Sequence, residues 1–225
     1  MMKKYVTGLA LIAVMPLAAG PMPEDFVEMN QALPDAIYDI RYYTDNNFVG
    51  EPVEGYLEPK CILQQQAAKA LQEVATKASE QGLKLKIFDC YRPQRSVAHF
   101  MRWAQDLSDI HTKADYYPNL PKDKLVGEYI AERSGHSRGA TVDLTLARQD
   151  SEGNWQELDM ASPFDMFDPL SNTANPTISA EQAANRQLLK ELMESAGFSN
   201  YAMEWWHYSL VPQPYPDTYF DFPVK

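Results

Sequence analysis

The stretch SGHSRGATVDLTL, residues 134–146, joins a glycine-containing loop to a segment in which apolar and polar residues alternate. The alternation predicts a strand over residues 141–146, with Asp143 and Thr145 on its polar face. The loop before the strand carries His136, and a turn at Arg138-Gly139 can bring the imidazole toward the Asp143 carboxylate. The stretch therefore indicates an imidazole and a carboxylate side by side at the start of a strand.

A second polar pair lies far along the chain, in the aromatic segment Glu204-Trp205-Trp206-His207. A carboxylate and an imidazole are costly to bury among aromatic rings unless they are hydrogen-bonded, paired or bound to a metal. Their three-residue spacing does not suit one face of a regular strand, so the pair requires a helical turn or a bulge. The buried setting therefore indicates a binding partner for this pair.

Two histidines and one carboxylate form a common catalytic zinc set, because three protein ligands leave the fourth position open for water. His136, Asp143 and His207 can supply this set, and Glu204 can take the proton of the water. The HExxH motif of helical zinc sites is absent from the sequence. Spacing alone leaves the alternative of unrelated side chains open. The other two histidines, His99 and His111, read as surface or packing residues.

The rest of the chain predicts an α+β fold with a small, mostly antiparallel sheet flanked by helices. Period-two alternation favours a strand over residues 83–87, and the aromatic and β-branched residues of 201–211 favour a last strand. Helical spacing favours helices over residues 62–81, 94–107, 122–132 and 180–196. Ser179 with Gln182 resembles a capping box at the start of the last helix.

Residues 1–20 have the composition of a secretory signal: Lys3 and Lys4, an apolar run over residues 5–15, then Pro16 and small residues. The run is too short to span a bilayer, so we expect removal of the signal and no membrane span afterwards. Residues 21–225 then form a single domain, expected in the periplasm. The formal net charge of −11 argues against nucleic acid or an anionic membrane as a partner.

The chain has two cysteines, Cys61 and Cys90. In an exported protein they can form a disulfide, because such bonds persist in oxidising compartments. Free buried thiols are the alternative, and the sequence leaves both open. Neither cysteine lies in a CxxC motif or beside a histidine, which argues against a catalytic or metal-binding role.

The two polar stretches together resemble the paired zinc motifs SxHxxGxxxD and ExWH of the D-alanyl-D-alanine dipeptidases. These are the VanX-like members of the LAS zinc peptidases, which also include D,D-carboxypeptidases and share their fold with the zinc-binding domain of Hedgehog proteins. The resemblance extends over residues 42–48, 89–95, 164–165 and 219–225. It implies a zinc enzyme that hydrolyses D-alanyl-D-alanine, with cell-wall D-alanine recycling as its expected role.

Carried over position by position, the resemblance implies that His136, Asp143 and His207 bind one zinc ion and that Glu204 is the general base and acid. It also implies that Arg92 stabilises the oxyanion of the scissile carbonyl. The substrate-binding positions that it implies are Asp165 and Tyr42 for the free ammonium, and Ser134. A D,D-carboxypeptidase acting on longer peptides and a non-catalytic zinc-containing cell-wall module are the alternatives.

Two positions depart from the pattern of close relatives. Gly135 stands where they often have a second serine, which can alter a contact to the substrate carboxylate. Ala161 stands where a glycine is usual, shortly before Phe164-Asp165. The second departure concerns the geometry of the loop that places Asp165.

Overall fold

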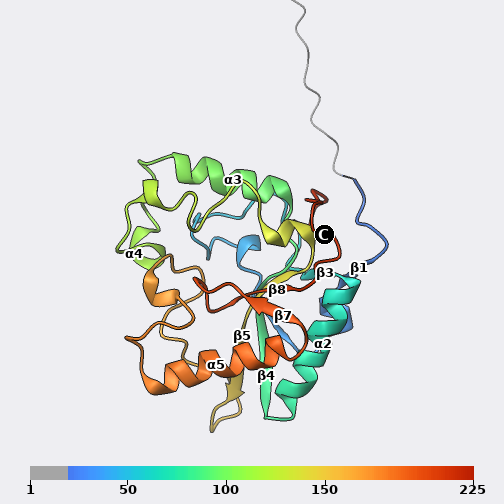
Figure 1. The fold of residues 1–225 in the computed structure, drawn as a ribbon. Helices are drawn as coiled ribbons and strands as arrows, with labels where there is room; N and C mark the ends of the chain where they lie inside the picture. Colours follow the sequence, from blue (N-terminus) through green and yellow to red (C-terminus); the bar gives the residue numbers. More distant parts are fainter. Residues whose placement is uncertain (1–19) are drawn as a thin grey trace, which may run out of the picture.

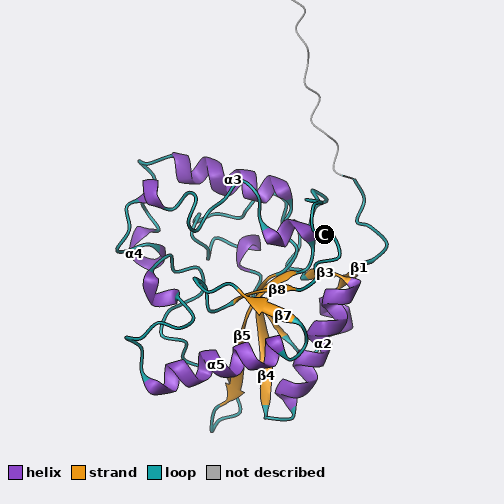
Figure 2. Cartoon of the chain, viewed as in Figure 1, coloured by secondary structure: helices purple, strands orange, loops and turns teal. Residues whose placement is uncertain are grey.

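The main sheet has the strand order β2-β4-β5-β8-β7, with β6 paired to the free end of β5, in a computed structural model that describes residues 20–225 (Figure 2). Only β2 and β4 run parallel; the other pairs are antiparallel. The expected α+β fold with a mostly antiparallel sheet is therefore confirmed. Except for its last residue, the expected signal segment 1–20 lies outside the described residues. The strands are β2 (Ile37–Tyr38), β4 (Leu83–Asp89), β5 (Thr141–Gln149), β6 (Trp155–Glu157), β7 (Phe198–Asn200) and β8 (His207–Leu210).

Three longer helices surround the sheet: α2 (Gln65–Ser79), α3 (Gln94–Gln105) and α5 (Ala180–Glu194). Figure 1 shows α2 beside β4 and α5 crossing in front of the lower part of the sheet, whereas α3 crosses the top of the molecule beyond the end of β4. The expected capping box opens α5, because Ser179 and Gln182 exchange side-chain and backbone hydrogen bonds. Two short helices, α1 (Met29–Ala32) and α4 (Lys113–Tyr116), lie in the connections. None of the helices within residues 20–225 combines the length and the apolar character needed to cross a membrane.

The helix expected over residues 62–81 begins later than the sequence suggested. Its first residues form β3 (Ile62–Gln64), which pairs with β1 (Phe26–Glu28) in a separate two-stranded sheet. The Gln64 side chain then accepts a hydrogen bond from the backbone N–H of Gln66 and caps α2. Long-range pairing with β1 thus takes precedence over the helical spacing of this segment.

Two further expectations were wrong. The helix expected over residues 122–132 is only a 3-10 turn at Lys122–Lys124, and the chain then reverses at Gly127, which has φ +95°. Of the strand expected over residues 201–211, only β8 (207–210) forms, because residues 201–206 make the turn that joins it to β7. That turn contains Glu204 and satisfies the earlier inference that Glu204 and His207 need a turn or a bulge between them.

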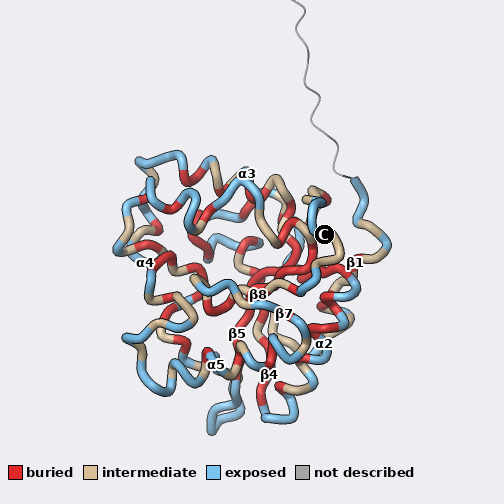
Figure 3. Tube along the Cα trace, in the orientation of Figure 1, coloured by how far each residue is buried: buried red, intermediate tan, exposed pale blue. Residues whose placement is uncertain are grey.

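The core of the sheet is formed by β4 and β5, which are buried over most of their length (Figure 3). Their register shifts by one residue between Ile87 and Asp89, so Asp89, and not Phe88, lies opposite Asp143. A bulge of this kind redirects the side chains that follow it. Next to it, Cys90 forms a disulfide with Cys61 and ties the end of β4 to the start of β3.

Candidate active site

One cavity of about 320 Å³ collects all the side chains that the sequence singled out for zinc, catalysis and substrate. Its walls come from β5, β8, the start of α3 and the loops around residues 42–48, 127–136 and 164–167. A volume in this range suits a small organic ligand. The lining includes Tyr42, Arg92, Ser134, His136, Asp143, Asp165, Glu204 and His207.

The sheet register brings His207 beside Asp143, because the two residues are directly opposite each other on β8 and β5. His136 comes from the 3-10 helix η3 (Gly135–Arg138), where Ser134 accepts a hydrogen bond from the His136 backbone N–H. Gly139 ends η3 with φ +79°, and a Cβ there would lie 2.3 Å from the Phe26 ring. Only glycine suits this turn, which returns the chain to β5.

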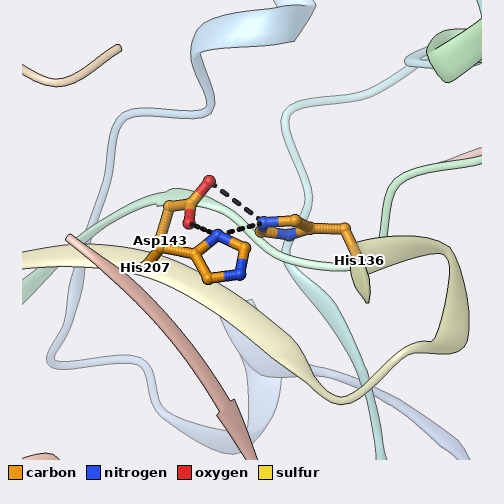
Figure 4. A group of neighbouring side chains, drawn as sticks. All are labelled: His136, Asp143 and His207. Carbon is orange, nitrogen blue, oxygen red and sulfur yellow. Dashed lines mark hydrogen bonds and ion pairs between the residues drawn. The ribbon is translucent and has the colours of Figure 1, made fainter. Parts of the chain in front are cut away.

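Figure 4 shows the three side chains pointing toward a common centre. His136 Nε2 lies 3.2 Å from Asp143 Oδ2 and 3.3 Å from His207 Nδ1, and His207 Nδ1 lies 3.1 Å from Asp143 Oδ1. Zinc bonds of about 2.0–2.1 Å in a tetrahedron place neighbouring ligand atoms about 3.3 Å apart. The spacing of the two nitrogens and the carboxylate therefore fits a zinc ion held by three residues, with a fourth position left free.

The hydrogen bonds around the three side chains support the same assignment. His136 Nδ1 lies 2.7 Å from the Cys90 carbonyl, which can only accept, so Nδ1 carries the proton and Nε2 presents its lone pair to the centre. Asp143 Oδ1 is buried, and within the described part of the chain it contacts His207 Nδ1 at 3.1 Å without accepting a well-directed hydrogen bond. A buried carboxylate oxygen without a well-directed donor, close to two imidazole rings, is the environment that a cation satisfies.

The electrostatics of the triad favour positive charge. Burial raises the pKa of Asp143, but His136 and His207 outweigh burial and leave that pKa below its ordinary value. Burial lowers the pKa of His207, and the contact with the charged Asp143 carboxylate more than reverses that effect. Asp143 is therefore an anion that draws positive charge to this point, whether a proton or a metal.

Glu204 lies at the edge of the triad, with Oε2 3.6 Å from His207 Nδ1. The turn is fixed by the His207 N–H, which donates to the Glu204 carbonyl, and by the Asn200 side-chain amide, which donates to the same carbonyl. Burial raises the pKa of Glu204 to about 7, because the carboxylate loses solvation that His207 restores only in part. A carboxyl group with this pKa is suited to proton transfer near neutral pH.

Arg92 is held by a residue to which the sequence gave no role. Its guanidinium contacts Asp89 Oδ2 through Nη2 and Nε at 2.8 and 2.9 Å, and Nη2 lies 3.5 Å from Asp143 Oδ2. The fully buried Asp89 also accepts a hydrogen bond from Tyr56. Asp89 thus fixes the guanidinium over the cavity. Only the bulge in β4 places Asp89 here, and that bulge has no sequence signal.

Tyr42 and Asp165 form a buried pair at another part of the cavity wall, where the Tyr42 hydroxyl donates to Asp165 Oδ2 at 2.8 Å. Burial, reinforced by the charge of Asp143, raises the pKa of Asp165 well above its ordinary value. A cation entering the cavity would stabilise the ionised form of this carboxyl group. The structure thus brings Tyr42 and Asp165 together in one wall of the cavity.

The backbone of the loop before Asp165 shows how the alanine at position 161 is accommodated. Ala161 has φ +72° and Asp165 has φ +62°, and both values lie in the left-handed region that favours glycine. The loop keeps the geometry that a glycine would adopt without strain. The alanine therefore does not displace Asp165 from the cavity.

Comparison with known proteins gives matches along most of the chain. Residues 22–225 match the family model of the D-ala-D-ala dipeptidases. A D-alanyl-D-alanine dipeptidase of Streptomyces coelicolor is 41% identical over 90% of this chain and 100% of its own length. A D-alanyl-D-alanine dipeptidase of Enterococcus faecium is 40% identical over 89% of this chain and 98% of its own. A zinc-bound vancomycin-resistance D,D-pentapeptidase structure aligns with TM-score 0.40 and 15% identity, over 69% of this chain and 76% of that one.

Proposed function

Because this chain belongs to the D-ala-D-ala dipeptidase family of peptidases, we propose that it hydrolyses D-alanyl-D-alanine to two molecules of D-alanine with the help of one zinc ion. The observation that carries the proposal is the triad of His136, Asp143 and His207. The two imidazole nitrogens lie 3.3 Å apart, and each lies 3.1–3.2 Å from one oxygen of the Asp143 carboxylate, close to the edge of a zinc tetrahedron. Glu204 and Arg92 beside them are the groups that a hydrolytic site needs and that a structural metal site does not.

The reaction adds water to the peptide carbonyl and breaks its C–N bond. Zinc bound by the triad would supply Lewis acidity, which lowers the pKa of a bound water to roughly 7. Glu204 takes the proton of the attacking water and then delivers a proton to the leaving amine. Arg92, fixed by Asp89, stabilises the negative charge that develops on the carbonyl oxygen.

The substrate is held at its amino end by Asp165 and Tyr42, which line the same cavity as the triad. Binding of the substrate ammonium offsets the burial of the Asp165 carboxylate. Because an extra residue on the amino side would remove this ammonium from Asp165, the contact favours dipeptides over longer chains. Ser134 adds a hydroxyl to the wall near His136.

We further propose that residues 1–20 direct the chain to the periplasm, where it recovers D-alanine from cell-wall turnover. The composition of the leader supports export, and the family match begins at residue 22, just beyond it. The disulfide between Cys61 and Cys90 also suits an oxidising compartment. Fractionation of cells that express the full chain would test this, and retention in the cytoplasm would contradict it.

The substrate is tested by measuring D-alanine release from D-alanyl-D-alanine and from a cell-wall pentapeptide with the same two terminal residues, before and after chelation. We expect release from the dipeptide only, loss on chelation and recovery with zinc. Release from the pentapeptide would favour a D,D-carboxypeptidase. No D-alanine release from either substrate, with zinc bound, would favour a non-catalytic binding module.

A further inference from the structure

A dipeptide carries a carboxylate one residue beyond the scissile bond, and the site described so far gives it no cationic partner. Four acidic side chains line the cavity: Glu128, Asp143, Asp165 and Glu204. Two arginines line it, Arg92 and Arg133. Because Arg92 is committed to the buried Asp89, Arg133 is the arginine of the lining left for a substrate anion.

Arg133 is exposed and lies three residues before His136, on the segment that leads into η3. Its guanidinium carbon lies 5.1 Å from the centre of the Tyr219 ring, within cation–π distance. Within residues 20–225 it makes no hydrogen bond and no ion pair with another side chain. The aromatic contact therefore holds the guanidinium while its N–H donors stay free.

Arg138 provides an internal comparison. Its guanidinium carbon lies 5.8 Å from the centre of the same Tyr219 ring, but Arg138 does not line the cavity, and its Nη1 donates to the Pro216 carbonyl at 3.1 Å. The two arginines thus share an aromatic neighbour and differ in their access to the cavity. Arg133 therefore differs from Arg138 in its position, because both carry a positive charge and only Arg133 lines the cavity.

We propose that Arg133 binds the C-terminal carboxylate of the substrate and makes the enzyme selective for peptides in which that carboxylate directly follows the scissile bond. The inference rests on the proposed function, and it adds a second charged contact to the ammonium contact at Asp165. An arginine fork matches a carboxylate with two parallel N–H···O hydrogen bonds.

The test compares Arg133→Ala with the wild-type enzyme on D-alanyl-D-alanine and on D-alanyl-D-alaninamide, which lacks the anionic carboxylate. We expect Arg133→Ala to lower kcat/KM on the acid by roughly 10- to 100-fold, mainly through KM, and to leave kcat/KM on the amide within about twofold. Arg138→Ala, the matched control, should leave both values unchanged.

Equal losses on acid and amide, or no loss on either, would overturn the role of Arg133. A loss in Arg138→Ala as large as that in Arg133→Ala would do the same, because it would indicate a general effect of positive charge. The wild-type rate on D-alanyl-D-alanine, measured beside the variants, tests the proposed function separately. An active wild type with an unaffected Arg133→Ala would contradict this inference alone.

Discussion

Asp89 and Asp143 lie opposite each other on β4 and β5, two fully buried carboxylates brought into register by a one-residue bulge. Two cationic or hydrogen-bonding groups separate them. Arg92 Nη2 lies 2.8 Å from Asp89 and 3.5 Å from Asp143, and the two nitrogens of His136 lie 3.4 Å and 3.2 Å from the same carboxylates. The active site is thus built around a pair of like charges that needs cations between them.

The first prediction concerns this buried ion pair. Asp89→Asn leaves the Arg92 guanidinium buried without its charged partner, so we expect the free energy of unfolding to fall by about 3–5 kcal/mol. The double variant Asp89→Asn, Arg92→Gln should lose less than Asp89→Asn alone, because it removes the uncompensated charge. Urea denaturation of the zinc-loaded proteins measures both. A double variant that loses as much as Asp89→Asn, or more, would contradict the coupling between the two residues.

The second prediction concerns pH. Glu204 must be ionised to accept a proton, so kcat/KM should fall as the pH drops through its pKa. Burial raises that pKa from 4.5 to about 7, and zinc nearby would lower it again, so we expect the acid limb between these two values. Zinc content measured at each pH separates proton uptake by Glu204 from metal loss. An acid limb above pH 7, or none down to pH 4.5, would contradict this role.

The third prediction concerns the disulfide, which closes a loop between cysteines 29 residues apart. The double variant Cys61→Ser, Cys90→Ser should lose about 3–4 kcal/mol of unfolding free energy. Its zinc affinity should also fall, because the Cys90 carbonyl orients His136. A reductant should destabilise the wild type to the same extent and leave the double variant unaffected. Equal sensitivity of the two proteins to reductant would contradict the assignment.

The fourth prediction concerns Ala161 and its φ of +72°. Replacing it with glycine relieves a left-handed conformation, so Ala161→Gly should raise the free energy of unfolding by about 1 kcal/mol. Ala184→Gly, at an exposed position inside α5, is the control and should lower the same quantity by about 1 kcal/mol. Thermal unfolding of both variants checks the opposite signs. Destabilisation by Ala161→Gly would contradict the inference that the backbone is strained at Ala161.

Local signals in the sequence predicted the elements whose boundaries depend on nearby residues. Alternation marked β4 and the start of β5, and the capping box of Ser179 and Gln182 marked the start of α5. The motif resemblance identified side chains from distant segments that line one cavity, including Tyr42 and Asp165, which are 123 residues apart. No periodicity could have joined that pair, because its contact depends on the whole fold.

The failures have physical causes outside the local pattern. Residues 62–64 form a strand because β1 supplies a partner, and the bulge that places Asp89 depends on the pairing of β4 with β5. Residues 122–132 are not helical because Gly127 takes a positive φ and turns the chain toward the cavity wall. Arg133 follows this segment, and its access to the cavity depends on that turn.

We propose that His136, Asp143 and His207 hold zinc while Glu204 transfers the proton, and the two roles can be separated by experiment. The experiment measures zinc per chain and turnover of D-alanyl-D-alanine on the same preparations of wild type, Glu204→Ala and His207→Ala. We predict that Glu204→Ala keeps one zinc per chain and loses turnover by at least about 100-fold, whereas His207→Ala loses both. Equal zinc loss in the two variants, or full turnover in Glu204→Ala, would contradict the assigned roles.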